Sequence, residues 1–371
     1  MSKKSVLFLT LKIFSATGGI EKVCRIVGRL LWEEVEQGNI GLDIYAMHDQ
    51  IALCDEKYFS NDVYKAFNSN KMAFGLRSIW AGISSRIVIL SHLNLVVFGY
   101  IIKLLHPSAK LVLFAHGIEV WKRLSWIQAK GLKKCDTVIC VSNFTREKMI
   151  SLHGVDRHRC LVLNNCLDPY LPEAKNDDKS MELLTKYSLK QDNIVLLTLS
   201  RLSAHDREKG YEKVLKAVNL LKDDFPMLVY MIAGKYDDAE KKWLDNLIDQ
   251  LELKNRVVFT GYVQDDQLAA HFGLSDIYVM PSTKEGFGII FIEAMHYGKP
   301  VIAGNKDGSV DALANGKFGL LVNPDDQKAV TNAVREMIIN KQLYVPNHQL
   351  VKEYFGYENY KSNLLQILNL N

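Results

Sequence analysis

The chain has 371 residues, which is more than one ordinary hydrophobic core holds and suits two domains. Its 48% hydrophobic and 24% charged residues are typical of a folded globular protein, and it contains no low-complexity segment and no repeat of 20 to 50 residues. Residues 1–150 hold 20 Lys and Arg against 12 Asp and Glu, although the net charge of the whole chain is only +4. This asymmetry indicates either attraction to a membrane surface or a phosphate-bearing acceptor, or simply solvated lysines. Because no basic run carries interleaved aromatic residues, no nucleic acid partner is expected.

The six cysteines include no CxxC pair and no Cys/His metal spacing, which indicates a reducing compartment. From Met1 the chain runs directly into an apolar, strand-like segment without the pattern of a signal peptide. Segment 87–105 is strongly apolar, but Ser91, His92 and Asn94 interrupt it, so its apolar length falls short of the ~20 residues of a spanning helix. We therefore expect a buried strand, a polar turn and a core helix there, in a cytoplasmic protein that is soluble or peripheral at the inner face of the membrane.

Short, nearly continuous apolar runs alternate with amphipathic segments along the chain, which predicts buried parallel strands separated by helices. Segment 169–192 is polar and contains two prolines, so it is expected to be a linker. The arrays on either side of it predict an α/β fold of two Rossmann-like, doubly wound domains facing each other across a cleft. The predicted strands are 6–11, 42–46, 87–91, 111–115, 137–141 and 160–163, then 194–199, 228–233, 257–260, 277–280, 301–303 and 320–322. Helices are expected at 19–36, at 143–152 and, as one last helix, at about 347–368.

A glycine-containing loop follows the predicted strand 277–280. Its residues Gly286 and Gly288 allow a ligand to approach the backbone, and the unpaired amides of the helix that follows suit a diphosphate. Glu285 lies on the loop and Glu293 about one turn into the helix, so the two carboxylates can accept hydrogen bonds from hydroxyls on either side of the phosphates.

Two cations lie near another strand end. Arg201 closes strand 194–199 and Lys209 opens the next helix, so both can contact one anion and offset the charge of a departing diphosphate. The insert 203–208 between them has two interpretations. It is either a charged turn or a loop in which Asp206 or Arg207 touches the ligand.

In this order, these segments resemble the signature of the retaining GT-B glycosyltransferases of family 4, the glycosyl transferases group 1 type. The matching positions run from residue 18 to residue 325 and are 18–23, 116–117, 141–143, 201 with 209–210, 233–234, 259–263 and 285–302. An isolated pair of glutamates with seven residues between them is weak evidence, whereas this ordered set is specific.

The resemblance implies that Glu285 contacts the hydroxyls of the donor sugar and Glu293 those of the ribose. It implies that Arg201 and Lys209 neutralise the diphosphate and that Val263 lies beside the base. The backbone lining the sugar and phosphates would be that of Gly286, Phe287, Gly288 and Ile289.

In the N-terminal domain, the resemblance implies that Gly18 and Gly19 form a loop that closes over the phosphates. His116 would face the donor sugar and the acceptor and take part in catalysis with Glu285, Arg201 and Lys209. The implied division is an acceptor-binding domain over 1–168, the linker 169–192, a nucleotide-sugar-binding domain over 193–346, and a final helix, 347–371, that crosses back to the first domain.

Several polar residues have competing interpretations. Where the family often has a Gly-Gly turn followed by glutamate, this chain has the segment 305–311, in which Asp311 either replaces the glutamate or has no role in the site. His92 and Asn94 form either a polar turn or part of a site. The Asp-Asp pairs at 177–178, 237–238, 265–266 and 325–326 are interpreted as helix caps, and no metal is expected. The segment 121–126, with its tryptophans and basic residues, is either a membrane contact or an ordinary helix face.

We therefore expect retaining transfer of a hexosyl group from a UDP- or GDP-sugar to a hydroxyl of a glycan or lipid-linked acceptor, without cofactor, in cell-surface polysaccharide or glycolipid biosynthesis. Two alternatives stay open. A nucleotide-sugar epimerase on the same scaffold would need acid and base carboxylates facing the sugar. A non-catalytic sugar-nucleotide-binding protein would usually have lost one of the four charged residues. Hydride transfer is disfavoured because the first glycine loop is not GxGxxG.

Overall fold

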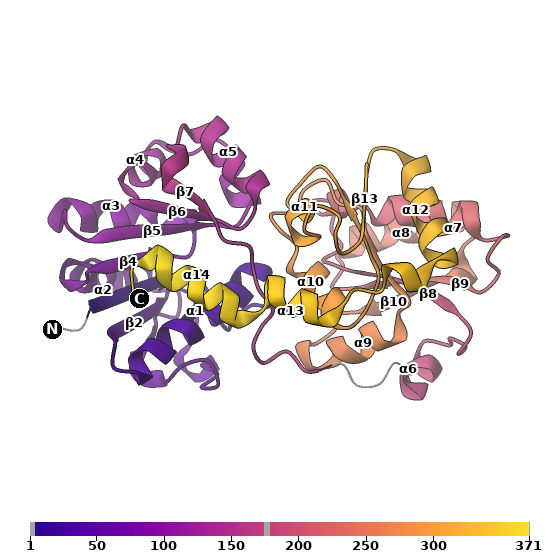
Figure 1. The fold of residues 1–371 in the computed structure, drawn as a ribbon, viewed down its shortest axis with the longest axis horizontal. Helices are drawn as coiled ribbons and strands as arrows, with labels where there is room; N and C mark the ends of the chain where they lie inside the picture. The colour runs from indigo at the N-terminus through magenta and orange to yellow at the C-terminus, as the bar shows by residue number, and fades with distance from the viewer. Residues whose placement is uncertain (1–3, 174–178, 371) are drawn as a thin grey trace. The chain divides into compact units, whose positions relative to one another are not determined.

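The computed structural model describes residues 4–173 and 179–370, and these form two compact units. Unit 1 holds residues 4–169 and 357–370, and unit 2 holds residues 170–173 and 179–356. Each unit is built on one parallel sheet packed between helices (Figure 1).

The sheet of unit 1 has seven parallel strands in the order β3-β2-β1-β4-β5-β6-β7. Along the sheet these strands are β3 (Tyr64–Ala66), β2 (Ile40–Ala46), β1 (Lys4–Thr10), β4 (Ile87–Leu90), β5 (Lys110–Ala115), β6 (Thr137–Cys140) and β7 (Cys160–Val162). The helices of this unit are α1 (Gly19–Glu36), α2 (Lys71–Ser84), α3 (Val96–Leu105), α4 (Trp126–Lys134), α5 (Asn143–His153) and α14 (Tyr357–Leu368).

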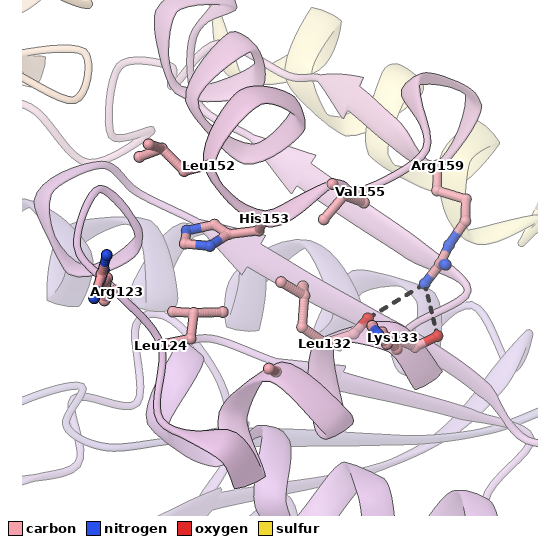
Figure 2. A pocket seen from close by; sticks show the side chains of 10 residues that line it. Arg123, Leu124, Leu132, Lys133, Leu152, His153, Val155 and Arg159 are labelled. Carbon is pink, nitrogen blue, oxygen red and sulfur yellow. Dashed lines mark hydrogen bonds between the residues drawn. The ribbon is translucent and has the colours of Figure 1, made fainter.

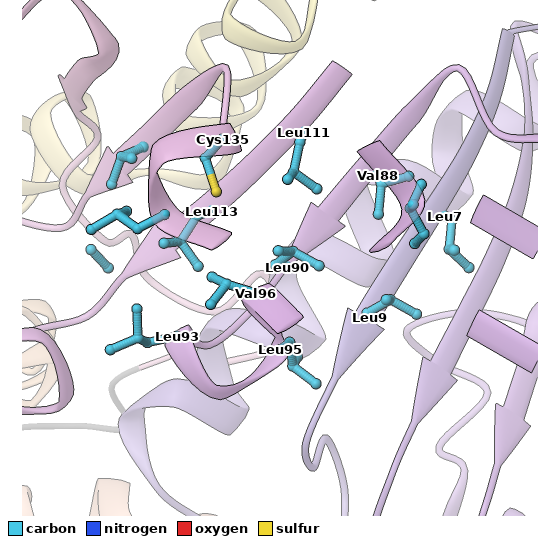
Figure 3. Packing of buried hydrophobic residues seen from close by; sticks show 14 of the residues in the cluster. Leu7, Leu9, Val88, Leu90, Leu93, Leu95, Val96, Leu111, Leu113 and Cys135 are labelled. Atoms are coloured by element: carbon cyan, nitrogen blue, oxygen red, sulfur yellow. The ribbon is translucent and has the colours of Figure 1, made fainter. Parts of the chain in front are cut away.

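The core of unit 1 forms where apolar side chains of the central strands meet the helices. Leu7 and Leu9 of β1, Val88 and Leu90 of β4 and the leucines of β5 are almost inaccessible to solvent, and they pack with residues of the α3 and α4 segments (Figure 3). Complete burial of consecutive strand residues requires cover on both faces of the sheet, which explains the nearly continuous apolar runs in the sequence.

The sheet of unit 2 has six parallel strands in the order β10-β9-β8-β11-β12-β13. Along the sheet they are β10 (Val257–Gly261), β9 (Leu228–Ala233), β8 (Ile194–Leu199), β11 (Ile277–Met280), β12 (Val301–Gly304) and β13 (Leu320–Val322). The helices of this unit are α6 (Met181–Lys186), α7 (Tyr211–Leu221), α8 (Asp238–Gln250), α9 (Leu268–Leu274), α10 (Ile289–His296), α11 (Ser309–Ala312), α12 (Gln327–Ile339) and α13 (His348–Phe355).

All twelve strands predicted from the sequence are present, with ends that differ by at most two residues. Strand β3 was not predicted, because it has only three residues and pairs on one side only, with β2, so it needs no apolar run. The apolar segment 87–105 is β4, a short turn and α3, as expected. Within the described residues, no helix has both the length and the apolar composition that crossing a bilayer requires.

The strand order reverses once in each sheet, between β1 and β4 and between β8 and β11. At such a point the loops that leave neighbouring strands turn to opposite faces of the sheet, which opens a crevice at the carboxyl ends of the strands. The loops after β1, β8 and β11 start there, and they carry most of the residues that the sequence singled out.

Two connecting segments differ from the prediction. The predicted linker contains α6, whose Leu183 and Leu184 are buried, because these leucines pack beside α9. The predicted last helix is two helices separated by Gly356, whose backbone is extended. A Cβ at Gly356 would lie 2.2 Å from the carbonyl oxygen of Lys352, so the chain turns there because this residue has no side chain.

The chain passes back to unit 1 with α14, which lies beside α1 in Figure 1. The Lys361 ammonium pairs with the Glu33 carboxylate of α1 at 2.7 Å, and the Lys110 ammonium donates to the carbonyl of Ile367 at 2.6 Å. Leu364 and Leu368 of α14 are fully buried. The C-terminal segment is therefore part of the unit 1 core.

Candidate functional site

The loop after β8 packs directly against the segment after β11. Gly210 ends this loop with a φ of +83°, and a Cβ there would lie 2.4 Å from the carbonyl oxygen of Pro281. The two backbones approach this closely because residue 210 is glycine. The approach places Lys209 beside Glu285.

Lys209 and Glu285 form an ion pair through Nζ and Oε1. Only 16% of the Lys209 side chain and 15% of the Glu285 side chain are exposed, so both charges have lost most of their water. Each charge then depends on the other, because an unpaired charge at this depth is strongly destabilising. The structure thus brings together one predicted cation and one predicted carboxylate.

The loop after β11 is held by Asp307, which follows the neighbouring strand β12 and is 2% exposed. Its Oδ2 accepts a hydrogen bond from the amide of Glu285 at 2.7 Å, and its Oδ1 accepts one from the amide of Ser309 at 2.9 Å. The amide of Gly308 donates to the carbonyl of Glu285 at 2.8 Å. Glu285 therefore has both its amide and its carbonyl fixed by the β12 loop.

Asp307 carries its charge in an unfavourable environment. Burial raises its pKa to about 6 and the nearby Glu285 charge adds to this, although the donors from Ser309 and Glu285 act in the opposite direction. Asp307 was not among the site residues predicted from the sequence. The available signal was an aspartate just after a strand and before Gly308-Ser309, which is typical of a turn whose side chain bonds to the backbone.

The helix α10 begins without a side-chain cap. Its N-cap residue, Gly288, has a φ of +84° and α10 starts at Ile289. Behind the loop, Phe287 packs edge-on against Phe355 with ring centroids 6.0 Å apart. The positive end of the helix dipole is thus available to an anion at the glycine loop.

Glu293 lies one turn into α10 and is 2% exposed. Burial raises the pKa of Tyr278 on β11 well above its usual value, and the charges of Glu285 and Glu293 raise it further. Both predicted carboxylates therefore lie near the same strand, one on the loop and one on the helix.

Arg201 and the insert differ in how firmly they are held. The Arg201 side chain is 81% exposed and its guanidinium is 3.5 Å from the Asp206 carboxylate. Arg207 is bound at 2.8 to 3.0 Å by both oxygens of Glu240, which is fully buried, and it stacks 3.9 Å over the ring of Trp243. Arg207 thus anchors the insert to α8, as in the charged-turn interpretation, whereas Arg201 is largely exposed.

Val263 follows β10 and is buried, with only 6% of the residue exposed. The preceding Gly261 accepts a hydrogen bond from the amide of Gly234 at 2.8 Å, which joins the loops after β9 and β10.

In unit 1, Gly18 is the N-cap of α1 and Gly19 its first residue. The loop between β1 and this helix is held by Asp49, a fully buried residue after β2 that was not predicted from the sequence. Its Oδ2 accepts from the amides of Ile13 and Phe14 at 2.8 and 2.9 Å. Although burial opposes ionisation, these donors and their neighbours lower the pKa of Asp49 below its usual value.

His116 also lies in unit 1, directly after β5. Its Nε2 donates to the carbonyl of Ser91 at 2.9 Å, and its amide donates to the Glu119 carboxylate at 2.5 Å. Burial lowers the pKa of His116 to about 4, so the ring is neutral near pH 7 and its Nδ1 carries the lone pair. His92 uses its Nδ1 to accept from the amide of Asn94 at 3.0 Å, as expected of a polar turn.

Aspartates of two of the predicted Asp-Asp pairs cap helices. The Asp237 carboxylate accepts from the amide of Glu240 at 2.7 Å at the start of α8, and Asp326 accepts from the first amides of α12. The pair at 265–266 forms a 3₁₀ turn, and the pair at 177–178 lies outside the described residues. Asp311 lies in the short helix α11.

Two protein-family models match this chain. The model described as Glycosyltransferase Family 4 matches residues 55–170, and the one described as Glycosyl transferases group 1 matches residues 181–353. The second match includes Arg201, Lys209, Glu285, Glu293 and Asp307.

Several sequence relatives are named as mannosyltransferases. One relative is the GDP-mannose-dependent alpha-(1-6)-phosphatidylinositol monomannoside mannosyltransferase of Mycolicibacterium smegmatis. The two proteins are 28% identical over 243 residues, and the alignment covers 62% of this chain and 61% of that protein. It is 26% identical over 203 residues to the O-antigen chain mannosyltransferase B of Escherichia coli, covering 54% and 51%. The matched regions thus span between half and two thirds of these relatives.

Solved structures match over nearly the whole chain. The Anabaena protein HepE in complex with UDP superposes with a TM-score of 0.80 at 20% identity, covering 98% of this chain and 99% of HepE. The pneumococcal O-GlcNAc transferase GtfA in complex with UDP and GlcNAc gives a TM-score of 0.71 at 13% identity, covering 100% and 99%. At these identities the likeness establishes the fold, which is two Rossmann-like domains of the GT-B type.

Replacing Asp307 with asparagine is expected to change how stability depends on pH. The folded-state pKa of about 6 lies above the usual value of about 4. The wild-type protein should therefore lose stability as the pH rises between these values, by on the order of 2–3 kcal/mol. Asp307→Asn has no charge to bury, so its thermal unfolding temperature should lack this decline. The exposed residue Asp245 gives the control Asp245→Asn, and parallel pH profiles for wild type and Asp307→Asn would contradict the assignment.

Proposed function

Because the chain belongs to the GT-B glycosyltransferases of family 4, we propose that it transfers a hexosyl group from a UDP- or GDP-sugar to a hydroxyl of a glycan or lipid-linked acceptor. Such an activity would serve cell-surface polysaccharide or glycolipid biosynthesis at the cytoplasmic side of the membrane. The names of the similar proteins support both a guanine and a uracil nucleotide as donor. The mannosyltransferase is GDP-mannose-dependent, and HepE was solved with UDP and with UDP-glucose.

The observation that carries the proposal is the Lys209–Glu285 pair beside the uncapped start of α10. A diphosphate that enters here meets the ammonium of Lys209 and the helix amides, and Arg201 has an exposed guanidinium on the same loop. When Lys209 turns to the phosphates, Glu285 is released to accept hydrogen bonds from the sugar hydroxyls. Donor binding would thus exchange one ion pair for two sets of contacts.

Glu293 would hold the ribose from its buried position on α10, and the base would lie against the backbone at Val263. The glycine loop 286–288 with Ile289 would line the sugar and phosphates. In unit 1, Gly18 and Gly19 would form the loop that closes over the phosphates.

We propose transfer with retention at the anomeric carbon. The bond from that carbon to the phosphate oxygen breaks as the acceptor oxygen adds on the same face, and the acceptor proton passes to the departing phosphate oxygen. Lys209, Arg201 and the α10 amides would stabilise the charge that develops on the leaving group, a contribution that fixed positive groups supply without a metal.

His116 would contribute as a neutral group. Because its Nε2 donates to Ser91 and its pKa is lowered to about 4, its Nδ1 can accept a hydrogen bond from a hydroxyl near pH 7 but carries no proton to give. Its proposed part is therefore to orient a hydroxyl of the sugar or acceptor.

Unit 1 also offers a surface suited to peripheral membrane contact. On α2 the side chains of Met72, Leu76, Trp80 and Ile83 are 79%, 70%, 70% and 41% exposed, and their spacing places them on one face of the helix. The exposed Arg77 lies on the same helix. An apolar row containing tryptophan beside basic residues suits an anionic bilayer surface. Elsewhere in unit 1, Trp126 of the predicted segment 121–126 is also exposed.

A donor screen tests the transferase proposal. The protein would be incubated separately with UDP-glucose, UDP-galactose, UDP-GlcNAc and GDP-mannose, with release of the nucleotide and thermal shift as readouts. One donor should raise the unfolding temperature and release nucleotide in an acceptor-dependent manner. A thermal shift without turnover would indicate a binding protein, and conversion of the sugar without nucleotide release would indicate an epimerase. Either outcome excludes the transferase.

Substitutions in the ion pair should reduce turnover strongly. Glu285→Gln and Lys209→Ala are each expected to lower kcat at least ~100-fold, because each removes a charge contact made at the reacting centre. Lys216→Ala is the matched control, since Lys216 pairs with Glu212 on the exposed face of α7. The assigned roles fail if either site variant keeps a rate close to that of the control.

Substitutions on α2 should weaken membrane binding. Co-sedimentation with vesicles of phosphatidylglycerol and phosphatidylcholine should fall at least about ten-fold in the double variant Leu76→Ser/Trp80→Ser, because two exposed apolar side chains leave the interface. Leu220→Ser, which replaces an exposed leucine of α7 in unit 2, should bind like the wild type. Equal sedimentation of all three proteins would rule out α2 as the contact.

A further inference from the structure

Three potential metal ligands meet in unit 2, and two of them lie close to the residues where the chain enters and leaves this unit. A carboxylate oxygen of Glu173, a ring nitrogen of His296 and a ring nitrogen of His348 all lie within 4.8 Å of one another. Glu173 follows shortly after the chain enters unit 2, His296 is the last residue of α10, and His348 is the first residue of α13. The two imidazole rings are 5.3 Å apart between centroids.

His296 is oriented in a way that metal-binding histidines share. Its Nε2 donates to the carbonyl of Pro172 at 3.2 Å, which leaves the lone pair on Nδ1. The residue is 4% exposed, and its Nδ1 is buried with no hydrogen-bond partner among residues 4–173 and 179–370. A buried lone pair without a donor is costly, and a bound cation would satisfy it.

The dimensions of the cluster suit a small divalent ion. Even if all three separations were 4.8 Å, the point equidistant from the atoms would lie only about 2.8 Å from each. Bonds from Zn²⁺ to imidazole nitrogen and carboxylate oxygen are about 2.0–2.2 Å, so the ligands need to move inward by less than ~1 Å each. Glu173 and His348 are exposed and can make the larger part of that movement, whereas His296 is buried.

Glu173 is paired with the ammonium of Lys352, which lies 3.1 Å from one of its oxygens. The Glu173 side chain is 72% exposed and that of Lys352 is 42% exposed, so the pair is weak and screened by solvent. A divalent ion can therefore displace Lys352 at little cost. The presence of a cation against Glu173 also shows that this position already favours positive charge.

We propose that Glu173, His296 and His348 form a binding site for a divalent transition metal ion of the Zn²⁺ class, with Nδ1 of His296 as the anchoring ligand. Two imidazoles and one carboxylate are a ligand set that Zn²⁺ prefers, and water completes the coordination at the exposed side. The ion plays no part in sugar transfer. The ion would link two segments to α10, the helix that also carries Glu293. One is the segment around Glu173, just after the chain enters unit 2, and the other is α13, just before the chain returns to unit 1.

Metal titration of the full chain tests this site. Protein dialysed against a chelator would be titrated with Zn²⁺ by calorimetry and, in parallel, with Co²⁺ by visible absorption. One equivalent should bind, raise the unfolding temperature and give Co²⁺ the intense visible bands of a four-coordinate site. The affinity should fall at least about ten-fold in His348→Ala and in Glu173→Gln, each of which removes one ligand.

Controls separate this site from adventitious binding. His348→Ala and Glu173→Gln change exposed side chains, so both should fold, and circular dichroism verifies this. His158→Ala removes an exposed histidine of unit 1 and should bind Zn²⁺ like the wild type. The proposal is overturned if the wild type binds no stoichiometric metal, or if His348→Ala binds it as tightly as His158→Ala.

Discussion

The hydrogen bond from the amide of Glu285 to the buried carboxylate of Asp307 is the contact on which the unit 2 site depends. It fixes the backbone of the loop after β11, and the position of the Glu285 side chain follows from it. Lys209 then pairs with that carboxylate, while Gly210 lets its own loop approach Pro281. Burying the Asp307 charge is unfavourable. A neutral side chain, however, could not accept hydrogen bonds from two backbone amides equally well.

Unit 1 uses the same device with different residues. Asp49 follows β2 and holds the loop after its neighbour β1, just as Asp307 follows β12 and holds the loop after its neighbour β11. In each case a buried aspartate reaches sideways at the carboxyl edge of a parallel sheet. A loop that must leave its own side chains or amides open to a ligand cannot stabilise itself, so the adjacent strand supplies the support.

The sequence predicted the framework well and its supports poorly. The central strands and α1 were predictable because burial on both faces demands apolar runs, and the Glu285 loop stood out by its glycines between a strand and a helix. Asp49 and Asp307 were missed because an isolated aspartate in a loop also fits a solvated turn, and only the fold shows which amides it reaches. The break between α13 and α14 was missed because Gly356 fits a helical periodicity, while its effect depends on the crossing of the chain between units.

The return of α14 to unit 1 has a consequence for biosynthesis. The seven-stranded sheet is complete once residue 162 has been made, yet the buried Leu364 and Leu368 and the Lys361 partner of Glu33 follow it only after the whole of unit 2. Domains generally fold in order as they leave the ribosome. Here the first unit to emerge must wait, with part of its apolar surface uncovered, until the whole second unit and then α14 have been synthesised.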